Sequence, residues 1–475
     1  MNNLIHKAAL VMAAMTMGAC ASWSPPPASS PQKSSTYLEH QLASRHPDLQ
    51  LRVAQRDAVV EQLLHQPLTP QTATQLMLLN APRIEMLLAE LGIANARRAQ
   101  VELIANPHFA VGALRSEGGG RWQLDLGLSQ SLLDLLTRSL RIDLADAELA
   151  QQQLALQGRL DEAIHELQSA YFAAVAAQEH LTVAEQYQLA NDAAYALAQA
   201  MRTAGNLSPA SFLQHQGSMQ QISQEIRQAR LAADTSRLQL AYLLGLQPHQ
   251  TFELPKQLPN IPEEHFLATD LLLQAQQHRP ELALIRRQQD FLADQHPIIT
   301  RSRWADITAG INVEREFDGA INAGPEVEFG LPLFDRGQAK LARLTAQSDA
   351  ARAQEAHLLR KTEYEIALAL RQLDDARQAH QDAMALQKTA REQLNESQRE
   401  VNFMLASPFD LLALKQQQIR LAADRIEAAK HYWQARTALV LAVGKTLPIA
   451  EPTGDTAPAR PSTAHPDHHG DHHHD

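Results

Sequence analysis

Two long stretches of the chain, over about residues 131–245 and 336–444, carry small and apolar residues at the three- and four-residue steps of a helix. A proline interrupts each stretch once, at Pro209 and at Pro408. We therefore predict two long helical hairpins that reverse at these prolines. A helix over 131–204 would be about 110 Å long at about 1.5 Å per residue, so neighbouring helices must support it along its length, as in a coiled coil.

The period changes to two residues just before each helical hairpin. In residues 108–129 and 304–333, apolar side chains alternate with small, polar and acidic ones. Gly118 to Gly120 and the stretch 318–324 carry the turn residues. The alternation predicts two strand hairpins of about ten-residue strands, each with one apolar and one polar face.

The two halves of the chain share landmarks at nearly one offset, which indicates an internal duplication. By subtraction of residue numbers, the offsets are 198, 203, 199 and 199 for Pro82/Pro280, Gly127/Gly330, Pro209/Pro408 and Gly245/Gly444. Each half is expected to contain short helices, a strand hairpin and a long helical hairpin. We place the first repeat at 37–245, a proline-rich linker at 246–262 and the second repeat at 263–444.

The N-terminal residues resemble an export signal. Residues 1–19 combine Lys7 with an apolar core and small residues before Cys20. Cys20 is the only cysteine, and its position resembles a bacterial lipobox, in which the thiol is acylated and becomes the mature N-terminus. The alternative is an ordinary cleaved signal peptide with an incidental cysteine. Residues 20–36 then form a Pro/Ser tether that has no means of building a core.

Charge and hydropathy narrow the class of protein. The formal net charge of the 475 residues is -11, which argues against a nucleic-acid partner because phosphate binding needs a basic surface. After the leader no apolar run reaches about 18 residues, so strands would have to carry any passage through a membrane. No phosphate loop, no nucleophile with its base and no closed metal site is visible, so we predict that the protein is not an enzyme and requires no cofactor.

The predicted fold class is mainly α with a small membrane β part. Alternating strands of about ten residues beside an export signal are typical of an outer-membrane barrel. Four strands are too few to close a barrel, so open edges in lipid demand oligomerisation. The competing hypothesis is a soluble periplasmic coiled-coil or metal-sequestering protein.

From about residue 70 to residue 447 the chain resembles the TolC-type outer-membrane efflux family. Three segments carry the resemblance: Asn80-Ala81-Pro82-Arg83-Ile84, Gly330-Leu331-Pro332-Leu333-Phe334-Asp335-Arg336-Gly337, and Asp410-Leu411-Leu412. The resemblance implies a homotrimer with a twelve-stranded barrel continuous with an α-helical tunnel. It also implies a periplasmic adaptor protein and an inner-membrane pump as partners, and an outer-membrane location that agrees with lipidation of Cys20.

The resemblance also points to the helical reversals. Asp410 matches an acidic, pore-facing position of the family, whereas Ala413 and Ser211 stand where further acidic residues would be. The alternative role for Asp410 is to cap the helix that begins beside Pro408. The expected adaptor contacts are the tip residues, for which simple helix-reversal chemistry is the competing explanation: Leu207, Ser208, Pro209, Ser407 and Pro408.

The last segment, 445–475, is rich in Pro, Thr and Ala and ends in a histidine tail, which we expect to be disordered. Its imidazoles and carboxylates suit Cu(II), Ni(II) or Zn(II), so weakly bound copper or zinc is expected there. Heavy-metal efflux, for example of copper, is the cargo hypothesis, and drug or protein export by the same fold is the alternative. Incidental metal affinity is the alternative for the tail itself. The candidate metal ligands are His465, His468, His469, His472, His473 and His474.

Overall fold

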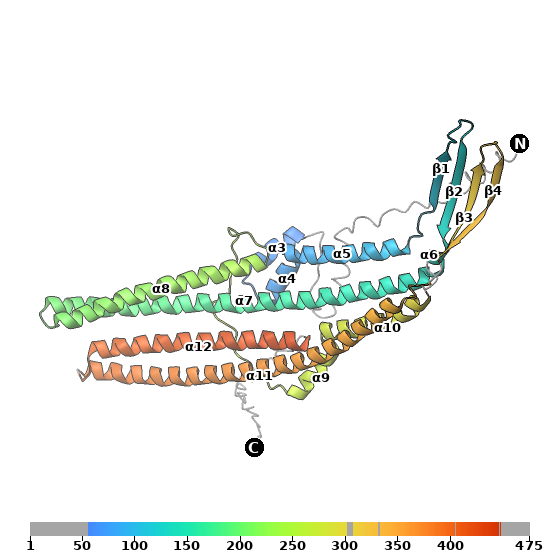
Figure 1. Ribbon diagram of the computed structural model, residues 1–475. Helices are drawn as coiled ribbons and strands as arrows, with labels where there is room; N and C mark the ends of the chain where they lie inside the picture. Colours follow the sequence, from blue (N-terminus) through green and yellow to red (C-terminus); the bar gives the residue numbers. More distant parts are fainter. Residues whose placement is uncertain (1–55, 302–306, 331–332, 404, 446, 448–475) are drawn as a thin grey trace, which may run out of the picture.

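The computed structural model describes residues 56–301, 307–330, 333–403, 405–445 and 447. Long helices dominate this part of the chain, and a small sheet stands at one end of them (Figure 1). The predicted signal peptide at 1–19, the tether at 20–36 and the tail histidines lie outside the described residues.

Both halves contain two short helices, a strand hairpin and a long helical hairpin in that order, and the described part of the first repeat has α3 and α6 in addition. In the first repeat these are α3 (Arg56–Leu64), α4 (Pro70–Asn80), α5 (Pro82–Glu102), β1 (His108–Leu114), β2 (Gln123–Ser131), α6 (Leu132–Leu136), α7 (Arg138–Thr203) and α8 (Pro209–Leu243). In the second they are α9 (Ala268–His278), α10 (Pro280–Arg301), β3 (Ile307–Arg315), β4 (Ile321–Phe329), α11 (Gln338–Asn402) and α12 (Pro408–Val443).

The four long helices lie side by side in the order α8, α7, α12, α11. Each helical hairpin packs internally, α7 on α8 and α11 on α12, and the two hairpins meet through α7 and α12. The outer helices of this layer are therefore α8 and α11, one from each repeat.

Ordinary helix-end chemistry sets the ends of α8 and α12. Pro209 and Pro408 occupy the first turn of their helices, where the missing N–H costs nothing. The return helices end where Gly245 and Gly444 take left-handed backbone angles, with φ of 73° and 71°. The predicted ends of both hairpins thus coincide with observed caps.

The main core lies midway along the helices, where α4, α5 and α12 pack on α7. The buried Tyr171 hydroxyl donates to the Leu68 carbonyl at 2.7 Å, and the rings of Phe172 and Trp433 stack with centroids 5.1 Å apart. Trp433 Nε1 also donates to the Pro259 carbonyl at 3.0 Å, so the proline-rich linker is fastened to this core. The cluster thereby joins the two repeats.

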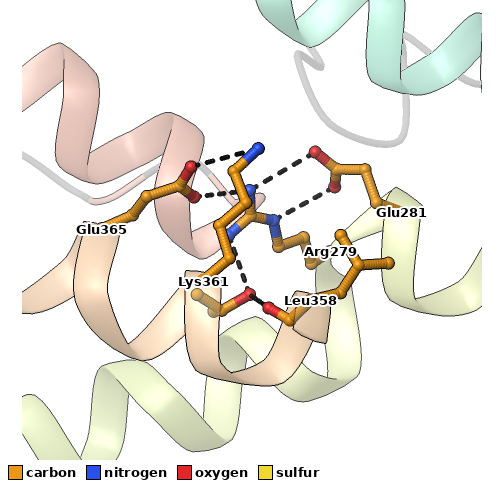
Figure 2. A network of polar contacts seen from close by, with 6 residues as sticks. Arg279, Glu281, Leu358, Lys361 and Glu365 are labelled. Atoms are coloured by element: carbon orange, nitrogen blue, oxygen red, sulfur yellow. Dashed lines mark hydrogen bonds and ion pairs between the residues drawn. The ribbon is translucent and has the colours of Figure 1, made fainter. Parts of the chain in front are cut away.

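A buried ion network marks the break between α9 and α10 in the second repeat (Figure 2). Arg279, only 5% exposed, pairs with Glu281 at 3.2 Å and with Glu365 of α11 at 2.6 Å, and donates to Thr362 Oγ1 at 2.9 Å. Burial by itself would lower the Arg279 pKa, but the two carboxylates outweigh it and raise that pKa above its ordinary value. The network ties the short helices to α11.

The strands form one antiparallel sheet in the order β1-β2-β3-β4. The two predicted hairpins are joined through β2 and β3, with Leu126 opposite Val313. Among the described strands β1 and β4 are the edges. Pro325 lies in β4, at an edge strand that tolerates a residue without an N–H donor.

The predicted starts of both long helices need correction. The first long helix starts at Arg138 and not at residue 131, because Ser131 still pairs with Thr308 in the sheet. The second starts at Gln338 and not at residue 336, because Gly337 has φ of 80°, outside the helical region.

The second strand hairpin also differs from the prediction. Its turn occupies 316–320, so the residues expected in the turn up to 324 belong to β4, which ends at Phe329 and excludes Leu333. The pair Gly127/Gly330 is consequently not equivalent, because Gly127 lies within β2 whereas Gly330 follows β4. The apolar alternation of β4 therefore ends at Phe329, before the predicted residue 333.

Candidate functional site

The sheet separates apolar from polar side chains onto its two faces. Successive residues of a strand point to opposite faces, and the pairing register aligns the alternation across the strands. Several large side chains of the apolar face are well exposed, for example Val111 at 64% and Val327 at 60%. The apolar face consists of Phe109, Val111, Ala113, Leu124, Leu126, Leu128, Ile307, Ala309, Ile311, Val313, Ile321, Ala323, Pro325, Val327 and Phe329, with Gln130 and Arg315 as its polar members.

The other face carries the carboxylates of the strands. Asp125 stands directly opposite Glu314, and Gln123 donates a hydrogen bond to the Glu314 carboxylate. Glu326 and Glu328 of β4 point to the same side. Placing like charges directly opposite one another destabilises a sheet, so this face needs water or counter-ions.

Nothing in the described part of the chain covers the apolar face or pairs with the outer edges of β1 and β4. A sheet with exposed apolar side chains and open edges requires another surface in its working state. No helix among the described residues is apolar over a stretch long enough to cross a membrane.

The helical reversals at the far end of the long helices are built alike in the two repeats. Ser208 Oγ accepts from the Ser211 N–H at 3.1 Å at the start of α8. Ser407 Oγ accepts from the Phe409 N–H at 3.2 Å at the start of α12. Leu207 is half-buried, and its carbonyl accepts from Arg202 at 3.3 Å. The helix-reversal chemistry is therefore present at Ser208 and Ser407, and the adaptor contact of the tip residues stays a prediction.

Asp410 is exposed and takes part in the cap of α12. Its Oδ2 accepts from the Ser407 N–H at 3.3 Å, completing a capping box. Ser211 is the third residue of α8, just as Asp410 is the third residue of α12. The two residues are therefore equivalent, as the sequence predicts. The capping role of Asp410 is therefore present, and its pore-facing role stays a prediction.

Contacts between the two repeats near the tips were missed from the sequence. The His215 ring of α8 stacks on Phe409 of α12, with centroids 4.6 Å apart. Closer to the core, Arg420 of α12 donates to the Tyr187 hydroxyl of α7 at 2.7 Å. Both contacts join residues more than 190 positions apart, so no local pattern could have revealed them.

The predicted lipid and metal residues cannot be placed in this geometry. Cys20 and the six tail histidines lie outside the described residues. Within the described ranges, no group of three or more His, Cys, Asp or Glu side chains is arranged to hold a metal ion. The site geometry thus consists of the amphipathic sheet and the two tips.

A comparison with known families finds a match for the first of the two repeats. Residues 73–246, from α4 to the end of the first repeat, match the family described as outer membrane efflux protein. These residues belong to the outer membrane efflux protein family. The resemblance to TolC-type channels drawn from the sequence is thereby confirmed. No curated protein matches the chain.

Solved structures with the fold of outer membrane efflux proteins extend the likeness to most of the chain. CusC has a TM-score of 0.63 and 15% identity, over 79% of this chain and 92% of that chain. VceC of Vibrio cholerae has a TM-score of 0.62 and 17% identity, over 82% and 96%. The open state of MtrE, an outer membrane channel of Neisseria gonorrhoeae, has a TM-score of 0.65 and 15% identity, over 79% and 89%. At these identities the likeness concerns the fold.

Proposed function

We propose that this chain is the outer-membrane channel component of a tripartite efflux system and forms a passive exit duct from the periplasm to the exterior. The observation that carries the proposal is the sheet with its uncovered apolar face and carboxylate-bearing opposite face. Lipid on the first face and water on the second satisfy both sets of side chains. The family match over residues 73–246 supports the same conclusion.

The working form in this proposal is a homotrimer. The edge strands β1 and β4 belong to different repeats, so β4 of one copy can pair with β1 of the next. Three copies then close a twelve-stranded barrel. Because β1 and β4 are different surfaces, the contact is head-to-tail, which is the kind that produces rings.

The outer helices of the layer support the same head-to-tail contact. α8 exposes Leu231, Leu238 and Tyr242 at helical spacing, and α11 exposes Tyr364 and Leu368. Packing α11 of one copy on α8 of the next would bury these side chains. The helices of three copies would then form the tunnel below the barrel.

The tips at Pro209 and Pro408 form the periplasmic mouth in this arrangement. They meet a periplasmic adaptor protein, which links the duct to an inner-membrane pump. Acylation of Cys20 adds a lipid anchor in the outer membrane. No catalytic step is involved, because the pump drives the transport.

For the cargo we propose heavy-metal ions such as copper. The support is chemical: the six histidines and neighbouring aspartates of the tail are a ligand set that suits Cu(II) or Zn(II). Drug or protein export remains the alternative, because the duct residues do not choose the cargo. A strain that lacks the protein should become sensitive to copper and not to drugs, and a drug-only phenotype would contradict the metal cargo. Deletion after Leu447 tests the tail separately: unchanged copper resistance in that variant would favour incidental metal affinity of the tail.

The channel proposal is tested by fractionation and conductance of the full-length protein. It should be recovered from the outer membrane as a detergent-dependent trimer and should conduct ions when inserted into planar bilayers. Recovery as a soluble periplasmic monomer would contradict the channel and favour the coiled-coil alternative.

A further inference from the structure

A row of cationic and aromatic residues crosses the end of the sheet that is remote from the helices. Leu124 of β2 pairs with Arg315 of β3 on the apolar face. One alternation further out, Arg115 follows β1 and Trp122 precedes β2, and the Arg115 guanidinium lies 5.5 Å from the centroid of the Trp122 ring. We call Arg115, Trp122 and Arg315 the loop-end band.

The band is the cationic exception on an otherwise uncharged face. Arg315 is the one charged member of the apolar face among the described strand residues. All four carboxylates of those strands, at Asp125, Glu314, Glu326 and Glu328, lie on the opposite face. The turns beyond the strands also carry Glu117, Glu316 and Asp318. The positive charge is therefore a property of the outer end of the apolar face and not of the turns as a whole.

The band arginines are available to an outside partner. Arg115 and Arg315 are both exposed, and within the described part of the chain neither forms an ion pair with a carboxylate. Arg121 differs, because its Nη1 donates to the Asp318 carbonyl at 3.2 Å and ties the two loops together. Trp122 is 51% exposed, so its ring can also contact a partner.

The spacing of the band matches the dimensions of a membrane. The nine residues of β2 span roughly 30 Å at about 3.3 Å per residue, close to the apolar band of about 25 Å on outer-membrane strands. With the apolar face in lipid, the loop-end band lies at the headgroups. An indole ring favours that interface, and a guanidinium binds a phosphate through paired hydrogen bonds.

We propose that Arg115, Trp122 and Arg315 bind the phosphate of a net-anionic lipid headgroup in the outer leaflet. The proposal rests on the proposed function, because it requires the sheet to lie in a membrane. Charge complementarity selects the headgroup class, since the band offers two unpaired cations and no anion. The arginine stems extend the apolar face while their heads reach the phosphate.

The test measures which lipid lies beside Trp122. The full-length protein is reconstituted into phosphatidylcholine vesicles that contain dibrominated phosphatidylcholine or dibrominated phosphatidylglycerol, both of which quench tryptophan fluorescence. Subtraction of the Trp122→Phe signal isolates Trp122 from the other tryptophans. The ratio of the two quenching curves gives the preference for the anionic lipid.

We expect phosphatidylglycerol to be preferred by about fivefold or more, since each arginine near an anionic surface contributes about a fivefold gain in binding. Arg115→Gln/Arg315→Gln should abolish the preference. The matched control, Arg343→Gln/Arg391→Gln, removes two exposed arginines from α11 and should leave it unchanged. Equal quenching by both lipids in the native protein, or an undiminished preference in the first double variant, would overturn the proposal.

The two proposals fail in different ways. If the protein does not float with either kind of vesicle, the outer-membrane channel itself is wrong. If it inserts into both and conducts ions but shows no lipid preference, the channel stands and the headgroup site is wrong.

Discussion

Gly444, at the end of α12, lies directly against the backbone of Arg279, between α9 and α10. A Cβ atom on Gly444 would come within 2.9 Å of the Arg279 Cα. The first repeat has the same relationship, because a Cβ on Gly245 would lie 2.5 Å from the Asn80 carbonyl oxygen. In each repeat the end of the return helix therefore packs on the break before a helix that starts with proline. In each repeat this contact joins the end of the long helical hairpin to the short helices.

Replacing either glycine by alanine should destabilise the protein strongly. Gly245→Ala and Gly444→Ala combine left-handed backbone strain with a clash against main-chain atoms that cannot move aside. We expect a loss of about 2–5 kcal/mol in the free energy of unfolding. Gly205→Ala is the matched control, because Gly205 has φ of 76° but no atom within 4 Å of its Cβ position. Its loss should be about 1–2 kcal/mol. Thermal unfolding of the three variants measures the difference, and equal losses would show that the close approach is unimportant.

Removal of the Arg279 side chain should cost more than removal of an exposed arginine. Arg279→Ala leaves Glu281, Glu365 and Thr362 without their shared donor, and we expect a loss of about 2 kcal/mol. Arg286→Ala is the control, since Arg286 pairs with Glu355 at 3.1 Å but is 47% exposed, and should lose at most about 1 kcal/mol. Chemical denaturation measures both variants. A larger loss for Arg286→Ala would contradict the central role of the buried network.

The helical hairpins and their ends could be predicted from the sequence because their signals are local. Proline in the first turn and glycine after the last turn predicted both ends of α8 and of α12 correctly. Strand ends were less accurate: the alternation of β4 continues through Ile321 and Ala323, but small residues before Pro325 resemble a turn. These residues form a strand because they pair with β3, Ile321 with Arg315 and Ala323 with Val313.

Contacts between the repeats could not be predicted, because no local signal records them. The stacking of His215 on Phe409 and the buried Arg279 network both depend on which helices become neighbours. Comparison of the two repeats does not reveal the network either, because Ala81 of the first repeat occupies the position of Arg279. The packing of α9 and α10 against α11 explains how an arginine can be buried there, because α11 supplies Glu365 and Thr362 as its partners.

Stability should fall as the pH decreases through the histidine range. Burial at the α7–α12 contact lowers the pKa of His165 below its ordinary 6.5, despite opposing effects of Thr437 and Glu166. Between about pH 6.5 and the lower folded-state pKa, the unfolded chain gains a proton that the folded chain does not, so stability falls and then levels off. His165→Gln should make the melting temperature less dependent on pH over this range. The exposed His180→Gln serves as control and should follow the native protein.

Trimer formation should depend on the exposed stripe of α8. Leu238→Glu introduces a charge where the proposed head-to-tail contact buries Leu231, Leu238 and Tyr242, so the trimer should dissociate in detergent. Light scattering coupled to gel filtration measures the mass. Leu189→Glu is the control: Leu189 is 71% exposed but lies on α7, which has α8 and α12 on its two sides. An intact trimer in the Leu238→Glu variant would place the subunit contact elsewhere.

Asp410 offers a test that separates a pore charge from a helix cap. Asp410→Asn keeps an oxygen that can accept from the Ser407 N–H but removes the charge, whereas Asp410→Ala removes both. If the carboxylate faces the pore, both variants should lose cation preference equally, as measured by the reversal potential of single channels under a salt gradient. Ser211→Asp, at the equivalent position of α8, should increase that preference. If Asp410 is only a cap, the reversal potential should stay unchanged in all three variants. The effect would then be confined to Asp410→Ala, as a loss of stability of about 1 kcal/mol.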